Sequence, residues 1–124
     1  MKNDILICDD AAFMRMMIKD ILEKNGYTIA GEAENGKVTV EKYKSLRPSL
    51  VLLDSVMPVM DGMEALRSIL ELDPLANIVM FFVKGEEVTM REAIQLGAKD
   101  IVLKPFSAEG LLDAVKKILG STAC

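Results

Sequence analysis

Short runs of apolar residues alternate along the chain with longer segments in which apolar residues recur every three or four positions. The runs cover residues 4–8, 27–33, 50–53, 78–83 and 101–103, and each is typical of a buried β-strand. The longer segments cover residues 14–24, 36–47, 63–72, 86–96 and 108–119, and their spacing predicts amphipathic helices. Five strands are therefore expected to alternate with five helices.

The ends of these segments carry the residues that begin and end helices. Asn35 and Ser107 precede two of the helical segments and can cap them. Gly26 and Gly97 follow two others, where glycine commonly ends a helix, and Pro48 stops a third. Because the strands are continuous apolar runs, they favour a parallel sheet that is covered by helices on both faces. The expected fold is a doubly wound α/β sandwich.

Composition narrows the classes of function. The 124 residues are 51% hydrophobic and 27% charged, which fits one folded domain over residues 1–124. The net charge is −4 and no basic run occurs, which argues against nucleic-acid binding. No apolar stretch is long enough for membrane insertion, and residues 1–4 lack the profile of a signal peptide. We expect a cytoplasmic protein that is a monomer.

Cysteine and histidine are scarce. Cys8 lies inside an apolar run and reads as a buried hydrophobe, whereas Cys124 is the last residue and reads as a solvated thiol. The chain contains no histidine. This excludes a Ser-His-Asp triad, the usual zinc sites and a phosphohistidine on this chain.

Charged residues gather where the predicted strands end. Asp9 and Asp10 follow the first strand, Asp54 follows the third and Lys104 follows the fifth. In open α/β sheets, ligands bind beyond the carboxyl ends of the strands, so these side chains should meet at one rim. Carboxylates with a phosphoryl partner are typical of a Mg²⁺ site, and a lysine there can contact a phosphoryl oxygen.

A simpler interpretation is that each acid caps the helix that follows it. It is the better explanation for any single residue, but it does not explain the whole set. Asp54 is followed by a loop that contains Pro58 rather than by a helix. Adjacent aspartates such as Asp9 and Asp10 also repel each other unless a cation lies between them.

Three blocks of sequence resemble the signature of response-regulator receiver domains. They are Asp9-Asp10, the segment from Asp54 to Gly62, and Lys104-Pro105-Phe106. The match runs over the whole chain, and residues 9–15 and 97–100 are most similar to the single-domain chemotaxis regulators of that family. The resemblance implies a flavodoxin-like strand order of 2-1-3-4-5.

The resemblance also implies a role for each residue of the site. Asp54 would accept a phosphoryl group, Asp9, Asp10 and Asp54 would bind Mg²⁺ together with the Val56 carbonyl, and Lys104 would contact the transferred group. Pro105 would hold Lys104 in an extended conformation, with a cis bond as one option. The donor would be a histidine kinase or a small acyl phosphate. The chain would signal through its own phosphorylation and would not be a turnover enzyme.

Two positions depart from the family pattern. The family carries Ser or Thr at the end of the fourth strand, followed by a small residue, where this chain has Phe82 and Val83. It carries an aromatic residue on the fifth strand where this chain has Ile101. These positions form the family's conformational switch. Losing one neutral hydrogen bond costs about 0.5–1.5 kcal/mol, so phosphorylation is expected to be slowed or loosened but not abolished. The switch lacks both of its usual residues and is expected to be affected more.

The resemblance further implies partners, and rival functions remain. A downstream target would bind residues 86–119, and a phosphatase could remove the phosphoryl group. The alternative is a degenerate or engineered receiver that acts only as an interaction module, which Phe82 and Ile101 favour. A phosphatase of the haloacid dehalogenase type needs Asp-x-Asp after the first strand, and a flavodoxin needs an uncharged phosphate-binding loop there. This chain has Asp9-Asp10-Ala11, and it lacks the glycine-rich motifs of nucleotide sites.

Overall fold

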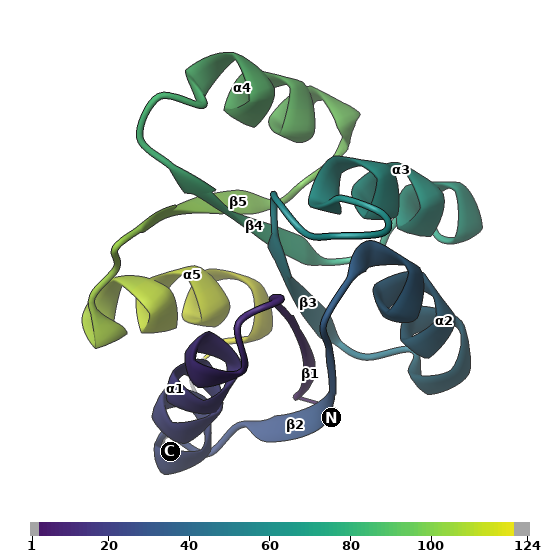
Figure 1. Cartoon of the computed structure of the whole chain (residues 1–124). Coiled ribbons are helices and arrows are strands. Elements are labelled where there is room, and N and C mark those ends of the chain that lie inside the picture. Colours follow the sequence, from purple (N-terminus) through teal and green to yellow (C-terminus); the bar gives the residue numbers. More distant parts are fainter. Residues whose placement is uncertain (1–2, 121–124) are drawn as a thin grey trace.

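The computed structural model describes residues 3–120, and in this range strands and helices alternate as the sequence predicts (Figure 1). Cys124 lies outside the described residues. The elements in chain order are β1 (Asp4–Cys8), α1 (Ala12–Lys24), β2 (Thr28–Ala33), α2 (Gly36–Leu46), β3 (Leu50–Asp54), α3 (Gly62–Leu72), β4 (Ile78–Val83), α4 (Glu87–Leu96), β5 (Asp100–Lys104) and α5 (Ala108–Leu119).

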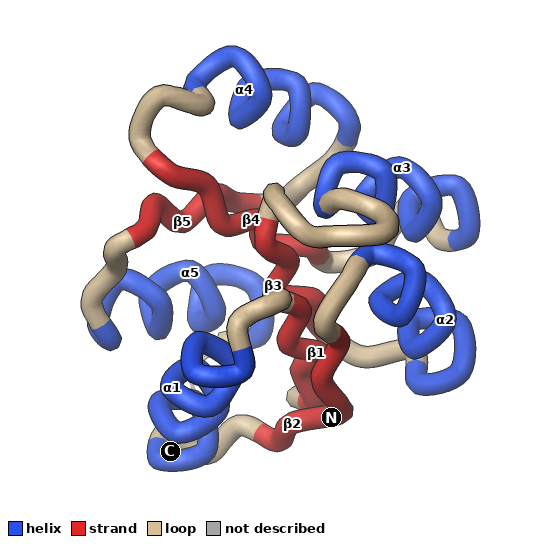
Figure 2. The backbone as a smooth tube through the Cα atoms, viewed as in Figure 1, coloured by secondary structure: helices blue, strands red, loops and turns tan. Residues whose placement is uncertain are grey.

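The strands within residues 3–120 form one parallel sheet in the order β2-β1-β3-β4-β5 (Figure 2). The predicted fold class and strand order are therefore confirmed. The order reverses direction at β1, because β2 lies on one side of β1 and β3 on the other. Ligands of open α/β sheets bind beside such a switch point, at the carboxyl ends of the strands.

Helices cover both faces of the sheet (Figure 1). On one face, α2, α3 and α4 cover a cluster that includes Leu53, Leu66 and Phe82. On the other face, α1 and α5 cover a second cluster that includes Ile18 and Leu111. Residues of β3 and β4 point alternately into the two clusters, which explains why these inner strands are almost wholly apolar. The edge strands β2 and β5 are less buried, and β2 contains a threonine and a glutamate.

Helix capping agrees in part with the sequence. The side chains of Asn35 and Ser107 accept hydrogen bonds from the backbone N–H groups of Val38 and Gly110, so both predicted caps are confirmed. The N-cap of α1 is Ala11, whose side chain makes no capping bond. Neither Asp9 nor Asp10 is therefore the N-cap of α1.

Two close backbone contacts fix the loop between β3 and α3 beside the carboxyl end of the sheet. Gly36 N–H donates to the Met60 carbonyl over 2.8 Å, and Gly62 N–H donates to the Ser55 carbonyl over 2.9 Å. A Cβ atom at Gly62 would lie 2.0 Å from the carbonyl oxygen of Asp54. Glycine at 62 therefore lets α3 begin directly against the end of β3.

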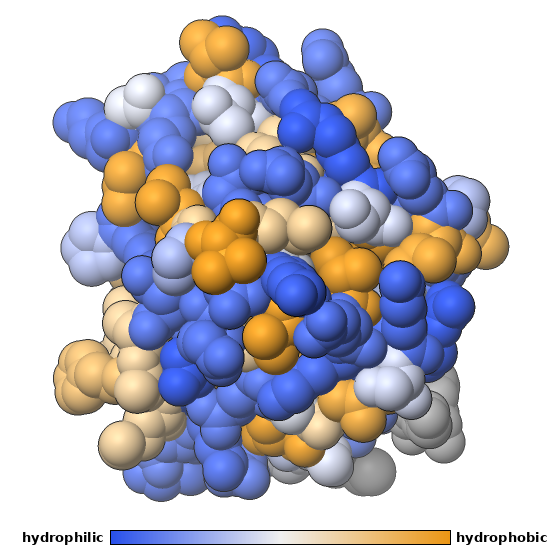
Figure 3. Space-filling view, turned by 45° about the vertical axis from the view of Figure 1, so that its right-hand side comes forward, coloured by the Kyte–Doolittle hydropathy of each residue, from blue (hydrophilic) through white to orange (hydrophobic). Residues whose placement is uncertain are grey.

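The surface has scattered apolar groups between hydrophilic ones, as Figure 3 shows for one face. The most exposed large apolar side chains are Leu75, Val59, Phe13, Val88, Val56 and Met16. Of the helices described in residues 3–120, none is long and apolar enough to span a membrane.

Candidate phosphoryl-acceptor site

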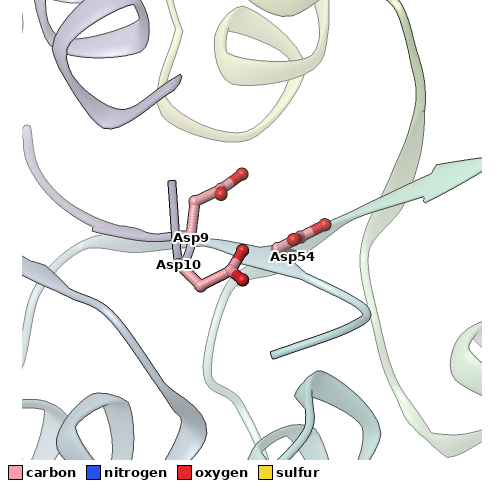
Figure 4. A group of neighbouring side chains, drawn as sticks. All are labelled: Asp9, Asp10 and Asp54. Atoms are coloured by element: carbon pink, nitrogen blue, oxygen red, sulfur yellow. The ribbon is translucent and has the colours of Figure 1, made fainter. Parts of the chain in front are cut away.

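Three aspartate side chains meet at the carboxyl end of the sheet. Asp9 and Asp10 follow β1, and Asp54 is the last residue of β3. Each offers a carboxylate oxygen within 4.8 Å of those of the other two, and Figure 4 shows the three side chains grouped at the strand ends. Asp9 and Asp54 are buried, whereas Asp10 is exposed. The carboxylates expected at one rim are therefore brought together.

Lys104 joins this cluster from the end of β5. Its Nζ lies 2.7 Å from Oδ2 of Asp9 and 3.2 Å from Oδ1 of Asp54. Burial lowers the pKa of Lys104, but the hydrogen bond to Asp9 and the charge of Asp54 outweigh burial and leave that pKa raised. The amine is therefore an ammonium ion at neutral pH. The peptide bond to Pro105 is cis.

The negative charge of the aspartate cluster is only partly neutralised by Lys104. Burial and the neighbouring Asp9 carboxylate raise the pKa of Asp54 to about 6, although Lys104 opposes this shift. Within residues 3–120, the cluster holds three carboxylates, and the ammonium of Lys104 contacts two of them, Asp9 and Asp54. Further positive charge at this place would relieve the repulsion between the acids.

The donor set fits Mg²⁺. Hard carboxylate oxygens from Asp9, Asp10 and Asp54 are ligands that Mg²⁺ prefers, and the exposed Asp10 leaves room for the water molecules that this ion retains. Val56 lies in the loop two residues after Asp54, with its side chain exposed.

Asp9 is fixed at both its side chain and its backbone. Its Oδ1 accepts from the Ala11 N–H over 2.9 Å, and its own N–H donates to the Ala33 carbonyl over 3.0 Å. Its carbonyl accepts from Nη1 of Arg15 over 2.7 Å, and Nε of Arg15 donates to Oε1 of Glu32 over 3.0 Å. Sequence reasoning assigned no role to Arg15 or Glu32, because this contact joins a helix to an edge strand and leaves no periodic signal.

The end of β4 is apolar on its inner side. Phe82 is fully buried and packs in the cluster beneath α3 and α4, and Ile101 packs partly buried against the same cluster. Val83, in contrast, is about half exposed. Phe82 thus fills core space on this face of the sheet.

A further carboxylate lies beside this end of the sheet. Oε1 of Glu86 accepts from the Val83 N–H over 2.8 Å, and the buried Ser55 hydroxyl donates to the same oxygen over 3.4 Å. Glu86 therefore links the residue that follows Asp54 to the end of β4. The neighbouring Lys84 is exposed.

Comparisons with known proteins agree with this geometry. Residues 5–116 match the model of the response regulator receiver domain. The chain is 53% identical to the chemotaxis protein CheY of Bacillus subtilis over 96% of this chain and 99% of that protein. It is 48% identical to CheY of Thermotoga maritima over 95% and 98%.

A solved structure shows the same arrangement of elements. The CheX-CheY-BeF3-Mg²⁺ complex from Borrelia burgdorferi contains a chain that superposes with a TM-score of 0.89 at 32% identity, covering 93% of this chain and 87% of that one.

Proposed function

This chain belongs to the family of response-regulator receiver domains, the signalling modules of two-component systems, and on that premise we propose that Asp54 is its phosphoryl acceptor. Its close similarity to CheY proteins supports a place in chemotaxis. The observation that carries the proposal is the convergence of Asp9, Asp10, Asp54 and Lys104 on one rim.

The proposed step is a displacement at phosphorus. A carboxylate oxygen of Asp54 attacks the phosphorus atom, an O–P bond forms, and the P–N bond to the kinase histidine breaks. The electron pair of that bond leaves with the imidazole. With an acyl phosphate donor, the broken bond is P–O and the carboxylate leaves. Phosphoryl transfer depends mostly on positioning and on neutralising oxygen charge.

We propose that Asp9, Asp10, Asp54 and the Val56 carbonyl hold Mg²⁺, which when bound supplies positive charge opposite the phosphoryl oxygens. Lys104 donates to the same group from β5, which requires that it release part of its contact with Asp9. The Borrelia CheY was solved with BeF3 and Mg²⁺, which supports a phosphoryl-type site of this kind in a relative.

The proposed partners follow from the family. A histidine kinase supplies the phosphoryl group, a downstream target binds the face formed by α4, β5 and α5, and a phosphatase ends the signal. A CheY relative binds CheX, which supports a protein partner for this chain as well. The chain acts as a monomeric signalling domain whose covalent state is its output.

A second candidate is a receiver that binds partners without productive phosphorylation. Phe82 and Ile101 favour it, because both switch positions are apolar and lie against the same core cluster. The intact acidic cluster and Lys104 favour phosphorylation instead. We therefore place the interaction-only function second.

The deciding experiment is the intact mass of the protein after incubation with Mg²⁺ and acetyl phosphate, beside Asp54→Asn. We expect a single phosphoryl addition that needs both Mg²⁺ and Asp54. An equal addition to Asp54→Asn contradicts the acceptor assignment. No addition to the parent, with Mg²⁺ binding confirmed by calorimetry, supports the interaction-only function.

A further inference from the structure

We propose that Arg15 and Glu32 are positioning residues for the metal-binding loop, and that they act through the backbone carbonyl of Asp9. The inference rests on the proposed Mg²⁺ site at Asp9, Asp10 and Asp54. Neither residue belongs to that cluster, so each can affect metal binding either through the loop that carries the ligands or through the electric field of its own charge.

The contacts form a continuous chain from helix to strand to loop. Arg15 lies in the first turns of α1, and its side chain is only 16% exposed. Its guanidinium donates through Nη1 to the Asp9 carbonyl over 2.7 Å and through Nε to Oε1 of Glu32 over 3.0 Å. The planar fork of arginine fixes the angle between these two bonds, which a flexible ammonium cannot do.

Glu32 is itself held on the edge of the sheet. It lies in β2, where it is paired with Ile7 of β1, and its backbone carbonyl accepts from Nζ of Lys42 in α2. These contacts fix the backbone of Glu32, whereas its carboxylate is on a side chain that is 37% exposed and is held by the bond from Nε of Arg15. The carboxylate orients the guanidinium, and the guanidinium in turn holds the turn that connects β1 to Asp10.

The loop between β1 and α1 is not held by a side-chain helix cap. Ala11, the N-cap of α1, makes no side-chain capping bond, so the loop between β1 and α1 is held instead by the bonds to Asp9. Asp10 follows Asp9 directly and is exposed, so its carboxylate depends on the backbone of Asp9 for its place. Groups that orient metal ligands from outside the coordination sphere typically change metal affinity about 10- to 100-fold when they are removed.

Charge and positioning predict opposite results, which makes the inference testable. Arg15 carries a positive charge near an acidic cation site. If it acted only through its field, removing it would strengthen Mg²⁺ binding. If it positions Asp9, removing it weakens binding. Glu32→Gln tests the same question from the other side, because it removes a negative charge but keeps an oxygen that can accept from Nε of Arg15. An effect of charge alone would weaken Mg²⁺ binding, whereas positioning predicts the parent affinity.

The experiment measures the Mg²⁺ dissociation constant by isothermal titration calorimetry for the parent, Arg15→Gln, Arg15→Lys, Glu32→Ala and Glu32→Gln. Lys24→Gln is the control, because Lys24 is an exposed cation on the same helix that pairs only with Asp20 among the described residues. Circular dichroism melts without Mg²⁺ establish the temperature at which every variant is folded.

We expect Arg15→Gln and Glu32→Ala to bind Mg²⁺ about 10-fold more weakly, Arg15→Lys to lie between them and the parent, and Glu32→Gln and Lys24→Gln to match the parent. At saturating Mg²⁺, the rate of acetyl phosphate labelling should return to the parent value in each variant. A purely structural role would lower the melting temperature without this restoration.

Unchanged or tighter Mg²⁺ binding by folded Arg15→Gln overturns the inference. If Arg15→Gln does not fold, Arg15→Lys decides the question, because it keeps the charge, and parent affinity in that variant also overturns the inference. Failure of the parent itself to bind Mg²⁺ would instead contradict the proposed function, so the two failures are distinguishable.

Discussion

Lys104 makes its shorter contact with Asp9, whose Oδ2 lies 2.7 Å from Nζ, and its longer contact of 3.2 Å with Asp54. The ammonium therefore neutralises a proposed metal ligand as well as the proposed acceptor. We predict that it competes with Mg²⁺ for the same carboxylates. Removing the Lys104 charge should therefore have opposite effects on Mg²⁺ binding and on phosphoryl transfer, which can be measured separately.

We expect Lys104→Gln to bind Mg²⁺ several-fold more tightly, because removing one positive charge from the cluster increases its attraction for a divalent cation. The same variant should accept the phosphoryl group from acetyl phosphate at least about 10-fold more slowly, because a donor to the transferring oxygens is lost. Calorimetry measures the first effect and intact mass over time the second. Weaker Mg²⁺ binding would show that Lys104 chiefly positions Asp9.

The hydrogen bond between Tyr43 and Asp73 predicts a pH-dependent contribution to stability. The hydroxyl of Tyr43, a residue buried as a whole, donates to Oδ2 of Asp73 over 2.8 Å, and this bond is the largest cause that lowers the pKa of Asp73. Tyr43→Phe should reduce the free energy of unfolding at pH 7 by about 0.5–1.5 kcal/mol. Urea denaturation measures this difference.

The sign of its pH dependence follows from linkage. Because the folded-state pKa of Asp73 lies below its unfolded value, its contribution is complete above about pH 4 and is lost as the pH falls through the folded pKa. The difference between parent and Tyr43→Phe should therefore narrow below about pH 4. Tyr27→Phe is the control, because Tyr27 donates to the uncharged Gly120 carbonyl. A difference that stays constant from pH 7 to pH 3 would contradict the assignment.

Much of the fold was predictable because local signals and global architecture agree. Most strands are apolar runs that end near a glycine, proline or capping residue, so the alternation of elements was readable from residues such as Asn35, Gly97 and Ser107. The grouping of Asp54 and Lys104 was predictable for a geometric reason. Carboxyl ends of parallel strands meet at one rim, whatever the separation of the residues in sequence.

Other features needed three-dimensional information. Phe81 and Phe82 are adjacent and equally apolar, and only the register of β4 assigns Phe81 to the cluster under α1 and α5 and Phe82 to the opposite face. The contact of Arg15 with Glu32 spans 17 positions between a helix and an edge strand. Polar residues at partly exposed positions have no periodicity that would have revealed it.

The close approach of Gly62 to the end of β3 predicts that Gly62→Ala disturbs the acceptor position. The added Cβ would lie 2.0 Å from the Asp54 carbonyl oxygen, which is backbone and cannot rotate away. We expect a loss in the free energy of unfolding above the about 1–3 kcal/mol of ordinary overpacking, measured by chemical denaturation.

Gly31→Ala is the matched control. Its added Cβ would lie 3.2 Å from Cδ1 of Leu46, the far end of a flexible side chain, so we expect a change within about 1 kcal/mol. Equal effects of the two substitutions would show that the end of β3 yields more easily than its contacts suggest.

The buried position of Phe82 predicts that restoring the family's hydroxyl has a structural cost. Phe82 is fully inaccessible in the cluster beneath α3 and α4, so Phe82→Thr removes most of a ring from the core and should reduce the free energy of unfolding by about 3–5 kcal/mol. Phe82→Leu keeps more of the apolar volume, lacks the hydroxyl and should lose less. Chemical denaturation of both variants measures the loss of stability, which in Phe82→Thr includes the burial of a hydroxyl.

The chemical contribution then follows from the same pair of variants. If a hydroxyl at position 82 reaches the phosphoryl group, Phe82→Thr should label faster with acetyl phosphate, or keep the label longer, than Phe82→Leu under conditions where both are folded. Phe82→Leu is a better reference than the parent, because both variants lose the ring and only Phe82→Thr adds a hydroxyl. Equal rates and lifetimes would mean that the direction in which residue 82 packs, toward α3 and α4, keeps its side chain out of phosphoryl chemistry. The receiver would then signal without a hydroxyl from β4.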